Sequence, residues 1–411
     1  MSLLFWGVYF PILFILRTIL YPFVYSRWTF ENKNLSETGA RSFAEQKLKA
    51  DLCFEFSSEG EYQQVASLID DALVMNKKIE LVFFSPSVEK AIVELAKKYP
   101  TQIRYLRYPL VTFGPFHSFT SWVTASELVM VRYDLFPEFL LWARKPENTL
   151  KMVWVSFKKE KLKNKNISWI KNEFLKASKV VFFASESDKL FGQNLGFKGE
   201  AYDFRMEQIR RRILLKDEKF AVQFPQYQKL KAQWENYPRD KRLIMGNAWP
   251  ADLPLLKDLP ADYFVLIVPH KLEPEILKAF HEGLKSINRH PLEILGAEVG
   301  TSDSMILNKK GVLCELYADF GRAYVGGGMG VSVHSLLEPL VAGSEYLSSG
   351  PVHHRSTEYD VALSLGSMTE VKNAQDFNLW LGLTLPESAG HDKIKPIFER
   401  YPLARKAVIS C

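Results

Sequence analysis

Short apolar runs alternate with longer amphipathic stretches from about residue 50 onward. In the first half of the chain, the apolar runs predict strands over residues 52–56, 79–84, 103–108, 128–133, 152–157 and 180–184. Helical periodicity between these runs predicts helices over residues 62–75, 87–98, 168–177 and 187–195. Short apolar strands that alternate with helices are typical of a parallel sheet covered on both faces. The pattern therefore predicts an α/β domain.

A charged, polar stretch at residues 206–240 separates this first set of elements from a second. The second set predicts strands over residues 243–247, 263–268, 292–295, 323–325 and 345–347. We therefore predict two Rossmann-like, doubly wound domains, over 29–205 and 241–385, joined by a linker at 206–240 and facing a cleft. A helix within residues 386–411 is expected to cross back to the first domain. Ligands of such domains bind at the carboxyl ends of the strands.

The N-terminal 28 residues have a different pattern. Residues 3–16 carry no charge, Arg17 interrupts the run, and aromatic and apolar residues continue to Trp28. No basic start and no small-residue cleavage site mark a signal peptide. The uncharged run is shorter than the ~20 residues of a clean span, but its Trp and Tyr content suits an interface. We predict a single membrane anchor over residues 1–28, spanning or interfacial, with Arg17 and Arg27 on the cytoplasmic side. The alternative is a buried helix of the fold.

Composition supports a globular protein of about two domains. The chain has 411 residues, of which 47% are hydrophobic and 24% are charged,. Its net charge of +6 comes without a clustered arginine and aromatic pattern, so we predict no nucleic-acid partner and favour a membrane surface or an anionic substrate,. The cysteines, Cys53, Cys314 and Cys411, show no zinc-binding or disulfide spacing, which favours a reducing compartment,.

The segment 323–351 is the most informative part of the sequence. After a short apolar run it carries three glycines and three polar side chains: Gly326, Gly327, Gly328, His334, Ser335 and Glu338. Glycines let a ligand approach the backbone, and the N–H groups that begin a helix bind anions. His334 and Glu338 stand four residues apart, so we predict that they share a helix face. The segment predicts a nucleotide site, with phosphate at the glycines and ribose hydroxyls at Glu338. The alternative is a turn whose glycines only permit tight packing.

A second candidate site follows the first predicted strand. Ser58, Gly60 and Glu61 stand where that strand passes into a helix, and small residues there leave room for a substrate. Glu61 is a candidate for binding substrate hydroxyls. The same residues fit a capping box, with Ser58 as N-cap and Glu61 at the third helical position, and both interpretations are compatible.

Further candidates lie at another strand end and next to the anchor. Pro269, His270 and Lys271 end a strand of the second domain, where His270 and Lys271 either neutralise a phosphate or carboxylate or are surface charges,. Glu31 and Glu37 follow the anchor. Either carboxylate is a candidate general base for a lipid-borne hydroxyl, with a solvated side chain as the alternative.

Taken together, these blocks resemble the Kdo (3-deoxy-D-manno-oct-2-ulosonic acid) transferase family of lipopolysaccharide synthesis. The family's Ser-Val-Gly-Glu strand end is similar to residues 58–61, and its Glu-Leu-Trp-Pro turn to residues 134–137. Its Pro-Arg-His stretch resembles residues 269–271. Its Val-Gly-Gly…His-Asn-x-Leu-Glu-Pro…Gly-Pro run resembles the segment up to Pro351, with Ser335 where the family has Asn. Val312 and Glu59 also depart from the family pattern, so the chain resembles a divergent member.

The resemblance implies a two-domain GT-B fold and an inverting transfer of Kdo from CMP-Kdo to a lipid A precursor at the cytoplasmic face of the inner membrane. It implies no metal and no cofactor besides the donor. Glu31 would act as base, with Glu37 as the fallback, and His334, Ser335 and Glu338 would bind the CMP. Two other functions remain open: a GT-B transferase of another nucleotide sugar, and a non-catalytic membrane-bound homologue that binds lipid or nucleotide.

Overall fold

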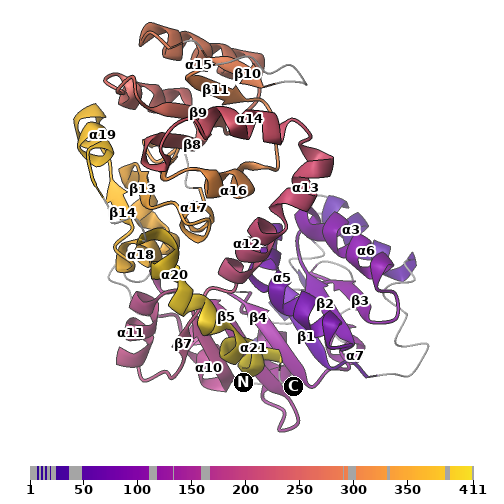
Figure 1. The fold of residues 1–411 in the computed structure, drawn as a ribbon. Coiled ribbons are helices and arrows are strands. Elements are labelled where there is room, and N and C mark those ends of the chain that lie inside the picture. Colours follow the sequence, from indigo (N-terminus) through magenta and orange to yellow (C-terminus); the bar gives the residue numbers. More distant parts are fainter. Residues whose placement is uncertain are drawn as a thin grey trace. The chain divides into compact units, whose positions relative to one another are not determined.

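The computed structural model describes residues 7–8, 11–12, 14–15, 19, 25–36, 49–110, 118–132, 134–158, 167–289, 291–294, 302–330, 334–384 and 389–409. The chain divides into two compact units (Figure 1). Unit 1 comprises Met1–Arg205 together with Pro402–Cys411, and unit 2 comprises Met206–Tyr401.

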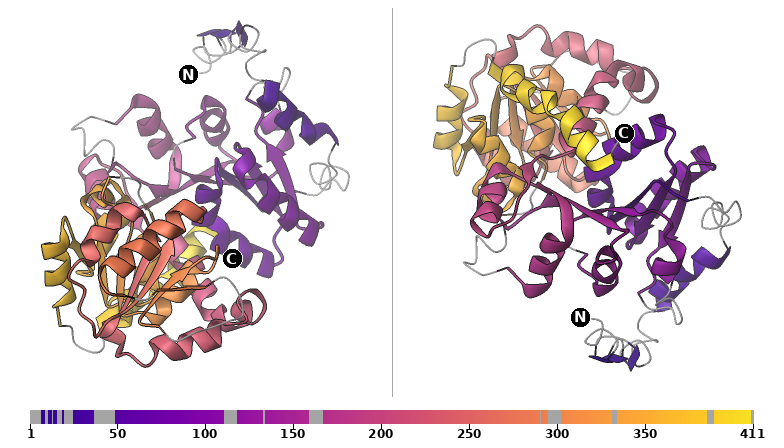
Figure 2. Two further views of the ribbon diagram at one scale, coloured as in Figure 1. Left: turned by 90° about the horizontal axis from the view of Figure 1, so that it is seen from above. Right: turned by 90° about the horizontal axis from the view of Figure 1, so that it is seen from below.

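Unit 1 is built on a seven-stranded parallel sheet of order β3-β2-β1-β4-β5-β6-β7. Its strands are β1 (Leu52–Phe56), β2 (Ile79–Phe83), β3 (Ile103–Arg107), β4 (Glu127–Val131), β5 (Thr149–Val155), β6 (Ser178–Phe183) and β7 (Glu200–Ala201). Its helices are α3 (Tyr25–Ser36), α5 (Glu59–Val74), η4 (Pro86–Val88), α6 (Glu89–Lys98), α7 (Ser118–Trp122), α8 (Pro137–Ala143), α10 (Trp169–Ala177), α11 (Glu186–Asn194) and α21 (Tyr401–Ile409). Helices cover both faces of the sheet (Figure 2).

Unit 2 repeats this plan with a parallel sheet of order β10-β11-β9-β8-β12-β13-β14. Its strands are β8 (Arg242–Ala248), β9 (Phe264–Pro269), β10 (Leu292–Ile294), β11 (Ser304–Leu307), β12 (Arg322–Val325), β13 (Tyr346–Ser349) and β14 (Met368–Glu370). Its α-helices are α12 (Arg205–Leu214), α13 (Lys216–Gln223), α14 (Tyr227–Trp234), α15 (Pro274–Ser286), α16 (Leu313–Leu316), α17 (Leu337–Val341), α18 (Thr357–Ser364), α19 (Ala374–Leu381) and α20 (Ala389–Glu399). Its 3-10 helices are η6 (Arg239–Lys241), η7 (Pro250–Leu256), η8 (Tyr317–Asp319) and η9 (Pro351–Arg355).

The predicted class of two doubly wound α/β domains is confirmed, and the predicted strands are present to within a few residues. The pattern missed three short strands, β7, β11 and β14, which have two, four and three residues. A run that short does not stand out from its surroundings as an apolar segment. Two of these strands, β7 and β14, are also sheet edges, where fewer neighbours select for apolar side chains.

Residues 206–240 do not form the polar linker that their charge suggested. They form α12, α13 and α14, and their aromatic residues enter the core of unit 2. Phe220, Phe224, Tyr227 and Trp234 are each 1% exposed. On α14, Tyr227 and Trp234 stand seven residues apart and share one face, whereas Lys229 is exposed and Lys231 half-buried,. The high charge of the stretch concealed an amphipathic pattern.

The C-terminal stretch predicted as one helix is two, α20 and α21. α21 belongs to unit 1 although the preceding helix belongs to unit 2. Lys151 Nζ on β5 donates to the carbonyl of Val408 at 2.6 Å. The Arg405 guanidinium also lies 3.3 Å from the Asp71 carboxylate on α5. These two contacts attach the end of the chain to the first sheet.

The predicted anchor falls largely outside the described residues. Of the N-terminal segment, α3 is the longest described helix, and it packs on unit 1 through Phe30, whose ring meets Phe83 of β2 edge-on. Among the described helices, none has the length and apolar character needed to cross a membrane.

Each sheet reverses its winding direction beside its first strand. β1 lies between β2 and β4, and β8 lies between β9 and β12. At such a switch point the helices that follow the two neighbouring strands go to opposite faces, which leaves an opening at the carboxyl ends. Both sheets also carry a bulge near this edge, at Trp154 (φ 59°) and Asn247 (φ 52°). A positive φ is uncommon for residues other than glycine, and bulges of this kind redirect side chains next to binding sites.

Candidate functional site

The glycine segment lies at the switch point of unit 2, directly after β12. The Gly326 N–H donates to the carbonyl of Gly246 at 2.8 Å, which joins the glycine turn to the end of β8. Gly327 has φ 84°, a conformation that side chains with a Cβ rarely adopt,. A Cβ on Gly328 would lie 2.6 Å from the nitrogen of Gly350. The structure therefore gives these glycines a packing role as well as a position at the ligand-binding edge.

Asp252 organises this turn from η7, and no sequence pattern had singled it out. Its carboxylate is fully buried and accepts from the Trp249 N–H at 2.8 Å, the Gly327 N–H at 3.2 Å and the Tyr324 hydroxyl at 2.9 Å. Burial raises the pKa of Asp252, against the effect of these donors. Asp252 thus ties together the ends of the strands that form the switch point.

A row of flat side chains lies beside the glycine turn. The rings of Trp249 and His270 stack at 4.9 Å, and those of His270 and His334 lie 4.4 Å apart. The His334 N–H donates to His353 Nε2 at 3.2 Å. Lys271 Nζ lies 5.6 Å from the Trp249 ring. Three strand-end segments of unit 2 contribute to this row, and His353, which no sequence motif indicated, is fully buried next to His334.

These histidines are held in the neutral form. Burial, followed by the neighbouring His270 and His353, lowers the pKa of His334 to about 4. Burial also lowers the pKa of His270, with Lys271 and Lys310 as further causes. Within the described residues, no group of histidines, cysteines and carboxylates is arranged to hold a metal ion. The row therefore offers neutral ring faces next to a lysine charge.

The structure corrects the predicted helix of the glycine segment. α17 begins at Leu337, after His334 and Ser335, so His334 and Glu338 do not share a helix face. The first N–H groups of this short helix are already occupied, because the Glu358 carboxylate accepts from Leu336 at 2.7 Å and from Leu337 at 3.4 Å. The predicted phosphate position at the helix N-terminus is thus filled by a carboxylate of the same chain.

Glu338 and Pro269, two further predicted site residues, have other contacts than the ring row. The Glu338 carboxylate lies 3.7 Å from the Arg212 guanidinium of α12. Burial, and then Glu338, raise the pKa of the Tyr317 hydroxyl, which lies against Gly246. Pro269 is the last residue of β9, and the His270 N–H next to it donates to the carbonyl of Ala248 at 3.0 Å. Glu338 therefore faces the α12 side of the unit, whereas Pro269 positions His270.

In unit 1, the predicted Ser58–Glu61 site lies at the end of β1. Ser58 is the N-cap of α5, but its side chain makes no cap hydrogen bond within the described part of the chain. Glu61 Oε2 instead accepts from the N–H of Ser57 at 2.7 Å and from the Ser57 hydroxyl. Ser58 is the N-cap and Glu61 the third residue of α5, as predicted, but the capping-box hydrogen bonds between these two described residues are not formed, because Glu61 binds Ser57 instead of Ser58. Gly60 has only the Ser58 hydroxyl, at 4.0 Å, near the position of a Cβ.

Glu31 lies on α3 near the ends of β2 and β3. Its side chain is buried, and Oε1 accepts from Arg27 Nε at 2.6 Å and from the Leu110 N–H at 2.8 Å. Arg27 also donates to the carbonyls of Phe84 and Tyr108, just beyond the two strands. The predicted alternative of a solvated carboxylate is thus wrong for Glu31. Glu37, the fallback base, lies outside the described residues.

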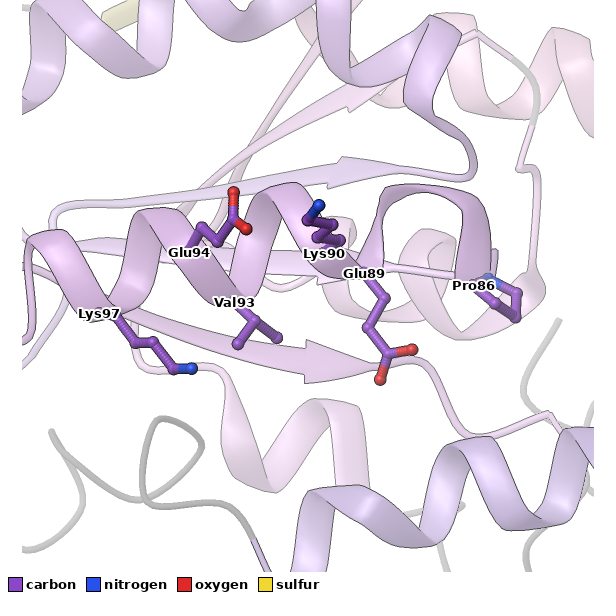
Figure 3. Close-up of a pocket in the computed structure, with 6 residues that line it drawn as sticks. All are labelled: Pro86, Glu89, Lys90, Val93, Glu94 and Lys97. Atoms are coloured by element: carbon purple, nitrogen blue, oxygen red, sulfur yellow. The ribbon is translucent and has the colours of Figure 1, made fainter.

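A hollow in unit 1 lies away from these side chains. It has a volume of about 380 Å³ and is lined by η4 and one side of α6, as Figure 3 shows: Pro86, Glu89, Lys90, Val93, Glu94 and Lys97. Glu89 in this hollow is bound by Arg107 and Lys33, at 2.7 and 2.9 Å. None of the side chains predicted for a site lines this hollow.

Comparison with known proteins shows a likeness of fold. No family model and no curated protein matches the chain. UDP-GlcNAc 2-epimerase from Methanocaldococcus jannaschii matches 85% of this chain and 99% of its own, with 12% identity and a TM-score of 0.56. The enzyme of that name from Neisseria meningitidis, bound to UDP-GlcNAc, matches 88% of this chain and 94% of its own, with 13% identity and a TM-score of 0.52. Two parallel-sheet α/β domains of this kind are consistent with the GT-B fold.

A third match concerns the predicted family. The C-terminal CMP-Kdo binding domain of WaaA from Acinetobacter baumannii matches 45% of this chain and 93% of its own, with 17% identity. Its TM-score is 0.32, too low to add an argument about fold or function.

Proposed function

We propose that this chain is a glycosyltransferase of the GT-B type that moves Kdo from CMP-Kdo to a lipid A precursor. The observation that carries the proposal is the glycine turn at the β8–β12 switch point, next to the row Trp249, His270 and His334. Parallel α/β sheets bind nucleotides at this edge. The order of sequence blocks around the turn supports the choice of Kdo transfer within this class.

The side chains of unit 2 suggest how the donor would be held. Neutral rings such as those of Trp249 and His270 suit stacking on a nucleobase,. Because the Glu358 carboxylate already accepts from the first N–H groups at α17, Lys271 would neutralise the negative charge of the phosphate. Ser335 would contribute a hydroxyl where an amide was expected from the resemblance.

For the acceptor, we propose Glu31 as the general base that removes the proton of the attacking hydroxyl. The oxygen of that hydroxyl then bonds to the anomeric carbon, and the phosphate oxygen of CMP leaves with the electron pair. We also propose that the enzyme acts at the cytoplasmic face of the inner membrane. The uncharged residues 3–16 support this location.

A second candidate is an enzyme of another nucleotide sugar. The likeness of fold to proteins that are UDP-GlcNAc 2-epimerases, with TM-scores of 0.56 and 0.52, favours this alternative. It would use the same glycine turn with a different base and sugar. A non-catalytic homologue that only binds nucleotide or lipid is the third outcome to distinguish.

One assay separates these functions. The full-length chain is incubated with labelled CMP-Kdo and lipid A precursor, and in parallel with UDP-GlcNAc, and free CMP, labelled lipid and the C2 epimer are measured. Labelled lipid with released CMP supports the proposal, and turnover of UDP-GlcNAc alone supports the second candidate. Donor binding without any turnover supports the non-catalytic function.

A pair of lysine variants tests the donor site. Lys271→Ala should weaken CMP-Kdo binding roughly ten- to a hundredfold, since a hydrogen bond to a charged group contributes ~1.5–3 kcal/mol. Lys278→Ala is the matched control, because Lys278 is an exposed lysine of α15 in the same unit. Equal affinities of the two variants in calorimetry would remove Lys271 from the site.

A further inference from the structure

Glu55 is a carboxyl group inside an apolar row of the first sheet. In the register of β1 it stands between Val82 of β2 and Met130 of β4, and all three side chains are fully buried. Most strand residues on this face belong to the hydrophobic core of unit 1. An ionised carboxylate in such surroundings has lost its hydration, which costs several kcal/mol unless donors replace the water.

No described donor forms a hydrogen bond of normal geometry that would replace that water. Neither carboxyl oxygen of Glu55 accepts an N–H or O–H with such geometry from the described part of the chain, and the same holds for Oδ2 of Asp134. Burial raises the pKa of Glu55 well above its usual range, and the carboxylates of Asp134 and Glu61 raise it further, against the weaker effect of the Val131 backbone N–H. Burial and Glu61 also raise the pKa of Asp134, against the effects of Ser57, Glu55 and Arg132. Two neighbouring carboxyls of this kind can bond to each other only if one of them keeps its proton.

The surroundings of the pair are acidic rather than basic. The Glu61 carboxylate of α5 lies next to the pair, and the Arg132 guanidinium lies 3.9 Å from Glu61. On β1 itself, Cys53 has a raised pKa because of burial and then Glu80 and Glu55. Glu80 is already bound by Arg104 and by the N–H groups of residues 124 and 125. Among the described residues, Arg132 lowers the pKa of Asp134, whereas the charged groups that act on Glu55 are the carboxylates of Asp134 and Glu61.

The backbone at this edge is shaped to keep the group together. Arg132, just after β4, has φ 63°, and its guanidinium lies 3.9 Å from the ring of Trp154. Trp154 has φ 59° at a bulge of β5, and its indole N–H donates to Asp203 Oδ2 at 2.8 Å. Positive φ values at two non-glycine residues cost free energy, and such strain persists where the surrounding contacts enforce it. Arg132 follows β4, which borders the switch point, and Trp154 lies near the end of β5, the strand beside β4.

We propose that Glu55 and Asp134 share one proton and form a binding site for sugar hydroxyl groups at the carboxyl ends of β1 and β4. Glu55 donates to Asp134 as a positioning residue, and Asp134 accepts a hydroxyl of the ligand. A carboxylate oxygen accepts but does not donate, so the ligand must bring donors, and the acidic surroundings disfavour an anion. The assignment of this ligand as the sugar part of the acceptor rests on the proposed function.

The shared proton is tested without any substrate. Infrared spectroscopy of the unliganded full-length chain at neutral pH should show the C=O band of a protonated carboxylic acid. The band should disappear in Glu55→Gln and persist in Glu59→Gln, which removes an exposed carboxylate from the first turn of α5. A wild-type protein without the band, or a band that survives in Glu55→Gln, overturns the shared proton. This result does not depend on the donor or on turnover.

The binding site is tested with the deacylated, water-soluble sugar head group of a lipid A precursor, by calorimetry. Glu55→Leu removes the donor but suits the apolar row, so it should fold and bind about tenfold more weakly, as expected for one lost hydrogen bond. Glu55→Gln keeps an N–H donor and should bind nearly as well as the wild type, and Asp134→Asn should bind about tenfold more weakly. Equal affinity of the wild type, Glu55→Leu and Asp134→Asn overturns the hydroxyl site. If the head group binds as expected but no Kdo is transferred from CMP-Kdo, the result supports the hydroxyl site and contradicts the proposed function.

Discussion

The pH dependence of stability in Glu55→Gln gives the sharpest test of the electrostatics of unit 1. Glu55 is fully buried and its pKa is raised well above the usual range. A carboxyl group whose pKa is raised on folding stabilises the folded state fully below its unfolded pKa of about 4.3. This stabilisation is lost as the pH rises from the unfolded pKa toward the pKa in the folded state, because the unfolded state releases its proton first.

The release of one proton on unfolding sets how strongly the stability of unit 1 changes with pH. Within this window, wild-type stability should fall by about 1.4 kcal/mol per pH unit relative to Glu55→Gln, whose amide does not titrate. Between pH 5 and pH 6 the free energies of opening should therefore diverge by about this amount, with the variant gaining. Since Asp134 is coupled to Glu55, the window belongs to the pair rather than to either residue,.

Hydrogen exchange of the β1 amides measures the opening of unit 1 by itself, whatever the behaviour of unit 2. The exchange of wild type, Glu55→Gln and the control Glu59→Gln would be followed at pH 5, 6 and 7, with correction for intrinsic exchange. Glu59→Gln should follow the wild type. Parallel pH dependence in all three proteins would refute the inference that Glu55 is protonated in the folded state.

Four further predictions concern other parts of the chain. Trp234→Ala should destabilise unit 2 by about 3–5 kcal/mol in urea unfolding, because the side chain is buried, whereas exposed Lys229→Ala should not,. Glu31→Ala should abolish transfer and destabilise unit 1 by roughly 3–5 kcal/mol, since it breaks a buried ion pair,. Glu31→Gln should lose transfer with a smaller loss of stability. A fully active Glu31→Gln enzyme would contradict the role of Glu31 as base. In NMR titration His334 should stay neutral down to about pH 4, so its contribution to stability is present above the unfolded pKa of about 6.5 and lost as the pH falls toward 4,. Gly326→Ala should lower the melting temperature, because a Cβ would lie 2.7 Å from Asp252 Oδ2, and an unchanged value would mean that the turn can shift.

Most strands of both sheets could be predicted because burial requires a local run of apolar residues in the sequence. A strand buried on both faces must be apolar at successive positions, as in Phe264–Pro269, and this run is readable without knowing its neighbours,. Helices that carry many charges hide their apolar pattern, as α12 to α14 did, because the few aromatic residues that enter the core are spaced among lysines and arginines.

The candidate site was only partly predictable, for a related reason. The glycines and His334 could be selected because they stand together in the sequence. Asp252, His353 and Glu358 reach this segment from η7, η9 and α18. They stand 75, 19 and 22 residues along the chain from the residues that they bind, and they carry no local signature. Hydrogen bonds between such distant segments arise only when the strands pair.

By itself, the sequence determined the two parallel-sheet domains and the strand ends at which polar residues and glycines gather. It did so because hydrophobic burial acts on each strand through its own side chains. Only the tertiary structure decided which carboxyl groups at those strand ends keep a proton and which backbone N–H groups are already hydrogen-bonded. The fold placed Glu358 on the N–H groups expected to bind phosphate, and it buried Glu55 beside Asp134 with no hydrogen bond of normal geometry to its carboxyl oxygens from the described residues. The pKa of a carboxyl depends on its solvation and on charges from other segments, and neither is written in the residues next to it.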